Sequence, residues 1–180
     1  MNLTKASKYL ALILRHKPEE IGIKLEKNGW ADTAKVVKGV SMRFSGFNME
    51  TLEEIVRTDS KQRYSFTEDK KKIRANQGHS VDVEIEFDEV EPPDVLFHGT
   101  ATRFMDSIFK DGLCSMTRQY VHLSGDHDTA VIVGSRHGKP IVFRVDCQKM
   151  VEDGFRFYRS ANGVWLTSHV PAKYLSIDSL

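Results

Sequence analysis

The sequence predicts an α+β protein built from two lobes, and three observations support that prediction. Apolar residues recur at helical spacing three times before residue 60, whereas most later apolar runs are short enough for strands. An acidic segment at residues 89–94, with two adjacent prolines, separates the two regions. Because the second region has many short strands and few helices, we expect mostly antiparallel pairing there. We place the lobes at residues 1–90 and 91–180.

The first lobe is expected to contain three helices and a hairpin. Apolar spacing predicts a helix over residues 2–16. Two shorter helices follow, with N-caps at Asp32 or Thr33 and at Asn48. Residues 63–74 form two short runs around a polar turn, which is a hairpin pattern. This order of elements is that of a winged-helix module, a fold that binds nucleic acid in some proteins and only protein in others.

The second lobe is expected to begin with an apolar strand that leads to His98. Before it, residues 81–87 alternate strictly and predict a half-buried strand. A helix after His98 should end at Gly112, which suits the C-cap position. The other elements expected here are a helix over residues 126–135 and strands at residues 121–124, 141–145, 155–158 and 164–167.

Composition excludes several classes of protein. The 180 residues carry 26 basic and 25 acidic side chains, so a nucleic-acid site must come from local clustering of Arg and Lys. No apolar run approaches the roughly 18 residues of a membrane span, and the N-terminus lacks an apolar signal core. Cys114 and Cys147 stand far apart without metal-ligand spacing. We therefore expect a cytoplasmic monomer with reduced thiols, no membrane association and no metal.

Two histidines on neighbouring strands form the first candidate site. His98 follows an apolar strand, and strand alternation places His122 and Ser124 on one face. Gly99 is expected to let the backbone approach a ligand because it lacks a Cβ, and Thr100 starts the next element. The pair could hold a ligand rigidly. Each histidine alone could equally be a half-buried residue with its hydrogen bonds satisfied.

Cations of the first lobe form the second candidate site. Arg15 closes the first helix, where it could complement the helix dipole or emerge into a cleft. Arg63 and Arg74 adjoin apolar hairpin residues that should fix their directions, whereas residues 70–72 could be a solvated charged face. The polar loop after the hairpin has donors suited to a phosphate or sugar around Gly78: Gln77, His79 and Ser80. The Rossmann and P-loop glycine patterns are absent.

Eight short segments occur in order along the chain, at residues 14–18, 62–64, 73–80, 97–100, 116–118, 121–124, 133–140 and 162–167. On these segments the sequence resembles the NAD-dependent RNA (tRNA) 2′-phosphotransferase family over nearly its whole length. The resemblance implies an N-terminal winged-helix RNA lobe and a C-terminal NAD lobe related to ADP-ribosyltransferases. It also implies that the protein removes an internal 2′-phosphate from RNA by transferring it to NAD. That reaction passes through a 2′-phospho-ADP-ribosylated RNA and yields nicotinamide, 2′-OH RNA and ADP-ribose 1″,2″-cyclic phosphate.

The resemblance also implies roles for particular residues. The catalytic set falls on Arg15, His16, Arg63 and Arg118, and we expect the three arginines to converge on the 2′-phosphate. Candidate NAD contacts are His98, Gly99, Thr100, His122, Ser124, Arg136, His137 and Gly138. Candidate RNA contacts are Arg74, Gln77, His79 and Ser80.

Three points stay open at the level of the sequence. Arg136 could instead be a surface charge. Tyr120 stands where the family usually has a second histidine, and Val164 lies in the region where related transferases carry a Glu. The alternatives to the implied reaction are an ADP-ribosyltransferase that caps terminal phosphates of nucleic acid, and a non-catalytic winged-helix protein.

Overall fold

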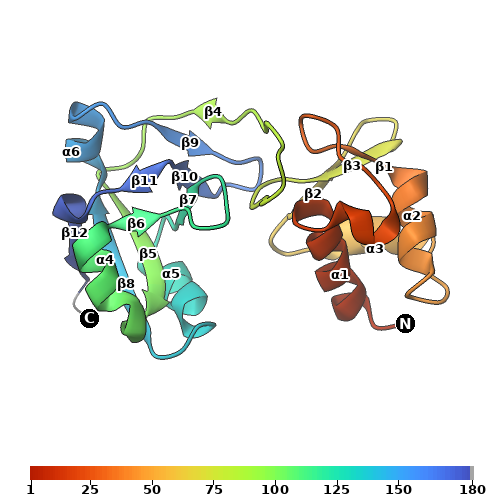
Figure 1. Ribbon diagram of the computed structural model, residues 1–180, viewed down its shortest axis with the longest axis horizontal. Helices are drawn as coiled ribbons and strands as arrows, with labels where there is room; N and C mark the ends of the chain where they lie inside the picture. The colour runs from red at the N-terminus through yellow and green to blue at the C-terminus, as the bar shows by residue number, and fades with distance from the viewer. Residues whose placement is uncertain (179–180) are drawn as a thin grey trace. The chain divides into compact units, whose positions relative to one another are not determined.

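The computed structural model describes residues 1–178, which form two compact units that meet in the sequence between Glu86 and Phe87 (Figure 1). Both units combine helices with short strands, and every strand pair described is antiparallel. The predicted α+β class and its mostly antiparallel pairing are therefore confirmed. Within residues 1–178, no helix has the length and apolar character needed to cross a bilayer.

The first unit contains three α-helices, one 3-10 helix and a three-stranded sheet of order β1-β3-β2. Its elements are α1 (Leu3–Arg15), η1 (Pro18–Ile21), β1 (Ala31–Asp32), α2 (Thr33–Ser41), α3 (Met49–Thr58), β2 (Tyr64–Phe66) and β3 (Lys72–Ala75). The predicted caps are confirmed, because Asp32 accepts from Lys35 N at 2.9 Å and Asn48 accepts from Thr51 N at 2.9 Å. The predicted hairpin also forms, with Ser65 opposite Arg74.

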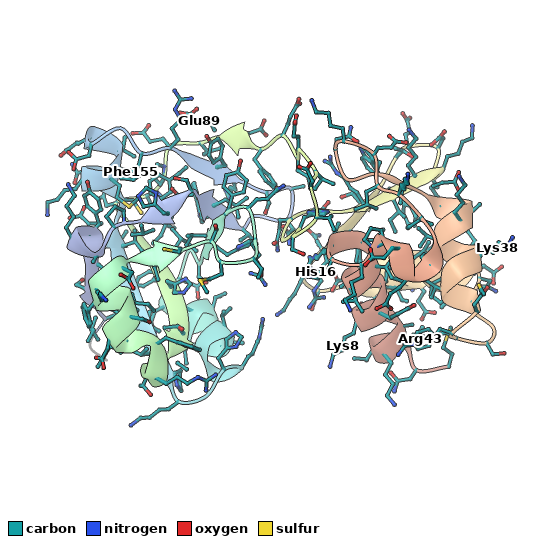
Figure 2. All side chains as sticks on the ribbon, viewed as in Figure 1. Lys8, His16, Lys38, Arg43, Glu89 and Phe155 are labelled. Carbon is teal, nitrogen blue, oxygen red and sulfur yellow. The ribbon has the colours of Figure 1, made fainter. Side chains whose placement is uncertain are left out.

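One face of α1 supplies much of the core of the first unit. Its apolar residues at helical spacing are fully buried, including Leu10, Ile13 and Leu14. They belong to the same apolar cluster as Leu52 of α3 and Ile73 of β3. At the rim of this cluster, the Arg43 guanidinium lies 4.5 Å from the ring centre of Tyr9 (Figure 2). This packing fixes the C-terminal end of α1, where Arg15 and His16 lie.

The strand predicted over residues 81–87 does not form. Val83 and Ile85 are buried as the alternation requires, but no strand within residues 1–178 pairs with the segment. A backbone bond from Glu84 N to Lys27 O, at 2.5 Å, ties the segment to the loop that precedes β1. An alternating pattern indicates burial on one side, and in this protein a loop meets that requirement without a partner strand.

The second unit contains three sheets and three α-helices. The sheets have the orders β12-β8-β5, β4-β9-β10-β7 and β11-β6. The strands are β4 (Asp88–Glu89), β5 (Val95–Ala101), β6 (Leu113–Cys114), β7 (Val121–Leu123), β8 (Pro140–Asp146), β9 (Phe157–Arg159), β10 (Trp165–Thr167), β11 (His169–Val170) and β12 (Leu175–Ile177). The helices are η2 (Thr102–Phe104), α4 (Met105–Asp111), α5 (His127–Ser135), α6 (Cys147–Glu152) and η3 (Ala172–Tyr174).

The second unit begins earlier than the segment at which the sequence suggested a boundary. β4 pairs with β9, with Asp88 opposite Arg159, so residues 88–89 belong to a sheet of the second unit.

Aromatic contacts also stabilise the region that follows α6. The Phe155 ring packs edge-on against the rings of His169 and Tyr174, at centroid distances of 5.2 and 5.6 Å (Figure 2).

Two glycines bring α5 against β5 (Figure 1). A Cβ on Gly99 would lie 1.6 Å from the carbonyl oxygen of Ala130, and a Cβ on Gly134 would lie 2.6 Å from that of Thr100. Gly99 therefore makes room for the backbone of α5. That Gly99 also lets the backbone approach a ligand stays a prediction.

Candidate active site

Arg15 and His16 lie at the C-terminal end of α1, where the loop of residues 76–80 docks on them (Figure 2). Ser80 N donates to the Arg15 carbonyl at 3.0 Å, and Ser80 Oγ lies 2.9 Å from His16 Nδ1. The backbone of Gly78 packs beside the Arg15 guanidinium, since a Cβ there would be 3.7 Å from Arg15 Cζ. Gly78 has φ +86°, which favours glycine. The loop thus holds both residues in place.

His79 is buried, with 2% of its surface exposed, and this corrects its assignment as an RNA contact. It hydrogen-bonds the backbone of Leu14, and its Nε2 is buried without a partner among the described residues. Burial, together with the charges of Arg15, His16 and Arg74, lowers the pKa of His79 to about 4. His79 is therefore neutral near pH 7 and braces the end of α1 from inside.

Arg63 is held through its backbone and through its side chain. Asp59 accepts from Arg63 N at 2.7 Å and forms an ion pair with the guanidinium. Asn76 N donates to the Arg63 carbonyl at 2.8 Å. The buried Asn76 side chain donates to Gln62 O and accepts from Ser65 Oγ, each at 2.7 Å. Asp59 and Asn76 were not among the residues predicted from the sequence. Asn76 acts across the hairpin, 11 and 14 positions from its partners, and Asp59 acts within the turn that ends α3.

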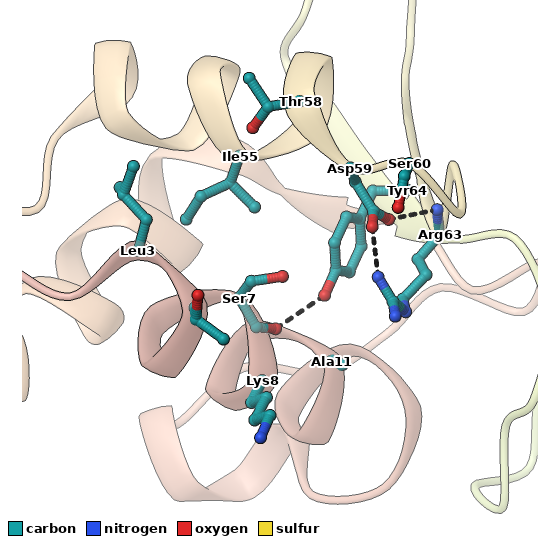
Figure 3. Close-up of a pocket in the computed structure, with 11 residues that line it drawn as sticks. Leu3, Ser7, Lys8, Ala11, Ile55, Thr58, Asp59, Ser60, Arg63 and Tyr64 are labelled. Atoms are coloured by element: carbon teal, nitrogen blue, oxygen red, sulfur yellow. Dashed lines mark hydrogen bonds and ion pairs between the residues drawn. The ribbon is translucent and has the colours of Figure 1, made fainter.

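A pocket of about 290 Å³ lies between α1 and α3, with Arg63 and Asp59 in its wall (Figure 3). At its base Tyr64 Oη donates to Ser7 O at 2.7 Å. Burial raises the pKa of Tyr64, while the charges of Arg15 and Arg63 both oppose that rise. The loop of residues 76–80 contacts both arginines, since Asn76 N donates to the Arg63 carbonyl and Gly78 packs beside the Arg15 guanidinium. Two of the three arginines expected to contact a phosphate are therefore held by one loop of the first unit.

Arg74 differs from the lysines of the hairpin. Its guanidinium lies 4.6 Å from the ring centre of Trp30, and burial lowers its pKa. No carboxylate of residues 1–178 lies within ion-pair distance of it in the structure. The lysines each have such a partner: Lys70 pairs with Glu53, Lys71 with Asp69 and Lys72 with Glu26. These lysines are a charge-balanced surface, whereas Arg74 keeps an uncompensated charge. Gln77 and Ser80, the other candidate RNA contacts, are half-buried and exposed respectively.

The two histidines of the second unit are linked through the main chain. Phe97 and Ser124 exchange backbone hydrogen bonds of 2.9 and 2.7 Å, which joins β5 to the end of β7. His98 Nδ1 lies 3.1 Å from His122 O, and His122 Nδ1 lies 3.1 Å from Tyr120 O. A carbonyl can only accept, so both rings carry hydrogen on Nδ1, and Nε2 is the acceptor of each neutral ring.

Electrostatics keep His98 neutral. Burial lowers the pKa of His98 and the charge of His137 lowers it further, against the opposing bond to the His122 carbonyl. His137 is exposed and follows α5, and its backbone N donates to Gly134 O at 3.0 Å. The second unit thus joins His98 to His122 by a hydrogen bond, while His137 lies in the turn after α5.

The other residues of the second unit that the sequence proposed as site residues differ in their exposure to solvent. Arg118 is an exposed side chain in the loop before β7, and partial desolvation lowers its pKa. Thr100 is only 8% exposed on β5. Arg136 and Gly138 lie in the exposed turn after α5, and Gly138 has φ +135°. Within residues 1–178, no group of three or more His, Cys, Asp or Glu side chains is arranged to hold a metal ion.

Comparison with known proteins identifies the class to which these residues belong. The chain is 49% identical over 179 residues to a protein of Flavobacterium johnsoniae, covering 99% of this chain and 98% of that one. It is 49% identical over 175 residues to a protein of Fusobacterium nucleatum, which covers 97% of this chain and 98% of that protein. It is 47% identical over 176 residues to a protein of Agrobacterium fabrum, which covers 98% of this chain and 95% of that protein. Each bears the name "Probable RNA 2′-phosphotransferase". The chain is thus similar throughout to proteins named as transferases that act on RNA.

The family profile described as RNA 2′-phosphotransferase, Tpt1/KptA family, matches residues 1–169. The chain therefore belongs to the RNA 2′-phosphotransferase family, and the resemblance inferred from its eight segments is confirmed.

Proposed function

We propose that this protein removes an internal 2′-phosphate from RNA by transferring it to NAD. The observation that carries the proposal is the loop of residues 76–80, which contacts both Arg15 and Arg63 within a member of this family. Arginine is always charged and can direct two parallel hydrogen bonds at a phosphate. Such a pair suits an anion better than it suits a neutral substrate.

In this proposal the first unit is a winged-helix RNA lobe and the second an ADP-ribosyltransferase-like lobe. The order of α1, α2 and α3 followed by the β2–β3 hairpin supports the first assignment. The uncompensated charge of Arg74 makes it the hairpin cation best suited to an RNA phosphate. Gln77 and Ser80 remain candidate RNA contacts in the adjacent loop.

NAD would be a substrate bound by the second unit. His98 fits the ribose next to nicotinamide, because a neutral imidazole whose Nδ1 is bound to a carbonyl presents Nε2 as an acceptor for a hydroxyl. His122, whose carbonyl holds the His98 ring, is the second candidate contact. Thr100, Ser124, Arg136, His137 and Gly138 are further candidate contacts. NAD supplies an electrophilic ribose carbon, C1″, with nicotinamide as the leaving group.

In the first step an oxygen of the RNA 2′-phosphate attacks C1″. A C–O bond forms, the bond to nicotinamide breaks, and nicotinamide leaves with the electron pair. The nucleophile is already an anion, so this step needs no strong base. Arg15 and Arg63 orient the phosphate and offset its charge.

In the second step the phosphorus is attacked by the ribose O2″. The new P–O2″ bond closes the cyclic phosphate, and the bond from phosphorus to the RNA 2′-oxygen breaks. The proton lost by O2″ must reach the RNA 2′-oxygen, and His16 is the candidate to carry it. Arg118 is the candidate to stabilise charge on the phosphate in this step.

The test uses an oligonucleotide with a radiolabelled internal 2′-phosphate, incubated with the protein with and without NAD. Release of the label as a small cyclic phosphate, only when NAD is present, is the expected result. Label retained on an ADP-ribosylated oligonucleotide after long incubation would favour capping of phosphates instead. No NAD-dependent change would refute the proposed reaction.

A further inference from the structure

We propose that Asp59 is the positioning residue that sets the direction of the Arg63 guanidinium, and thereby the recognition of a 2′-phosphate by Arg63. The inference rests on the proposed function, because it takes Arg63 as a phosphate contact. Asp59 itself would touch neither the RNA nor NAD.

The oxygens of Asp59 are used inside the protein. Oδ2 accepts from Arg63 N at 2.7 Å, and Oδ1 accepts from the Arg63 guanidinium (Figure 3). Oδ1 also accepts from Lys61 N at 3.4 Å. The Asp59 side chain is only 6% exposed, whereas that of Arg63 is 31% exposed. The carboxylate is therefore withdrawn from solvent, while the guanidinium keeps an accessible side.

The turn that carries Arg63 is held in an unusual conformation. Gln62 has φ +44°, in the left-handed region that side-chain-bearing residues avoid, and its N donates to Asp59 O at 2.8 Å. On the other side, Asn76 fixes the carbonyls of Gln62 and Arg63. Arg63 is thus fixed at its N–H, its carbonyl and its guanidinium. A surface arginine that served only solubility would not need three such restraints.

Direction matters because a guanidinium recognises phosphate through a planar fork of N–H groups. Asp59 binds one nitrogen of that fork and so limits the side-chain rotation that would turn the remaining donors away. A misplacement of about 1 Å in a catalytic site can lower the rate about 100-fold. Loss of Asp59 should therefore lower phosphate recognition even though Arg63 itself remains.

Asp69 offers a matched control within the same unit. Its Oδ1 accepts from Thr67 Oγ1 at 2.7 Å and from Lys71 N at 3.1 Å, and it forms an ion pair with Lys71 at 3.5 Å. Asp69 thus supports a turn and pairs with a cation, as Asp59 does, but its partners are residues of the hairpin turn and not Arg63. The Asp69→Ala variant therefore shows how far kcat/KM falls when only the support of a turn is lost.

The experiment measures kcat/KM for release of the 2′-phosphate with NAD in six proteins: wild type, Asp59→Ala, Asp59→Asn, Asp69→Ala, Arg63→Lys and the double variant with Arg63→Lys and Asp59→Ala. In parallel, without NAD, it measures the affinity of each protein for an oligonucleotide with a 2′-phosphate and for the same oligonucleotide with a 2′-hydroxyl. Thermal unfolding checks that each variant is folded. Asp59→Asn keeps an acceptor for Arg63 N–H and serves where Asp59→Ala does not fold.

We expect Asp59→Ala to lower kcat/KM about 10- to 100-fold, Asp59→Asn to lower it in the same direction, and Asp69→Ala to change it less than about 2-fold. In the Arg63→Lys background, Asp59→Ala should cost less than about 3-fold, because the group it positions is already gone. The preference for the 2′-phosphorylated oligonucleotide should fall with Asp59. An equal loss in both backgrounds, or unchanged turnover and preference in Asp59→Ala and Asp59→Asn, would overturn the inference. A wild type inactive with NAD would refute the proposed reaction alone, and the affinity comparison would still decide the role of Asp59.

Discussion

The contact of α5 with β5 makes Gly99→Ala a demanding test of the fold around His98. The added Cβ would lie 1.6 Å from Ala130 O, whereas real contacts of a Cβ essentially never fall below 3.0 Å. α5 would therefore have to move by roughly 1.4 Å from a strand that it touches along several residues. Because Ala130 is fully buried, the displacement opens the core on one side while it relieves the clash on the other.

We expect Gly99→Ala to lower the free energy of unfolding by about 3 kcal/mol, the upper end for overpacking of a core. For a chain of this size that corresponds to a fall in Tm of about 6–12 °C. Differential scanning calorimetry measures the change. Gly125→Ala is the control, since its Cβ would meet only Trp165 Nε1, at 3.8 Å, and its Tm should stay within about 2 °C.

A different pair of results would refute the packing argument. If Gly99→Ala kept the Tm of the wild type but lost affinity for NAD, the space beside Gly99 would serve a ligand. The expectation drawn from the sequence would then be right, and Gly99 would not be needed for the packing of α5.

Three further predictions concern the first unit. Arg63→Lys should lower kcat/KM for 2′-phosphate release at least about 100-fold, because an ammonium cannot form a fork, and near-normal turnover in a steady-state assay would remove Arg63 from the catalytic set. The depressed pKa of His79, about 4 against 6.5 in the unfolded chain, means that its contribution to stability is present above pH 6.5 and is lost as the pH falls through 4. Between pH 7 and pH 4 the free energy of unfolding, obtained from urea titrations, should therefore fall more for the wild type than for His79→Gln, by up to about 3 kcal/mol, and parallel curves would contradict this. Asn48→Ala should cost about 1 kcal/mol through loss of the cap of α3, and an unchanged Tm would show that the helix does not depend on that bond.

Local signals predicted much of the fold. Asn48 precedes an apolar stripe and caps α3, and Gly112 follows the last residue of α4, as the C-cap rule requires. Local signals failed for residues 81–87, because a pattern that predicts burial does not show which segment of the chain covers the buried side. Residues 81–87 alternate because one side is covered, yet a loop covers it. The short α6 was missed, since six residues after a strand give too little periodicity to distinguish a helix.

The sequence named candidate site residues but not their contacts. Arg15, His16 and Arg63 belong to motifs that the sequence displays, and their roles stay predictions, whereas the loop of residues 76–80 that contacts Arg15 and Arg63 became visible only in the structure. His79 lies in such a motif but is buried, because a donor in a polar loop can face inward as easily as outward. The bond from His98 to the carbonyl of His122 joins residues 24 positions apart, and no local pattern could have indicated it.

The side chain of Asn76 holds the turn at Arg63 in a way that only an amide can. Its amide nitrogen donates to the Gln62 carbonyl at 2.7 Å, while its oxygen accepts from the Ser65 hydroxyl at 2.7 Å. Replacement of that nitrogen by an oxygen, as in Asn76→Asp, would place two acceptors opposite each other in a buried place. The identity of one buried atom therefore decides whether the Gln62 carbonyl keeps its donor.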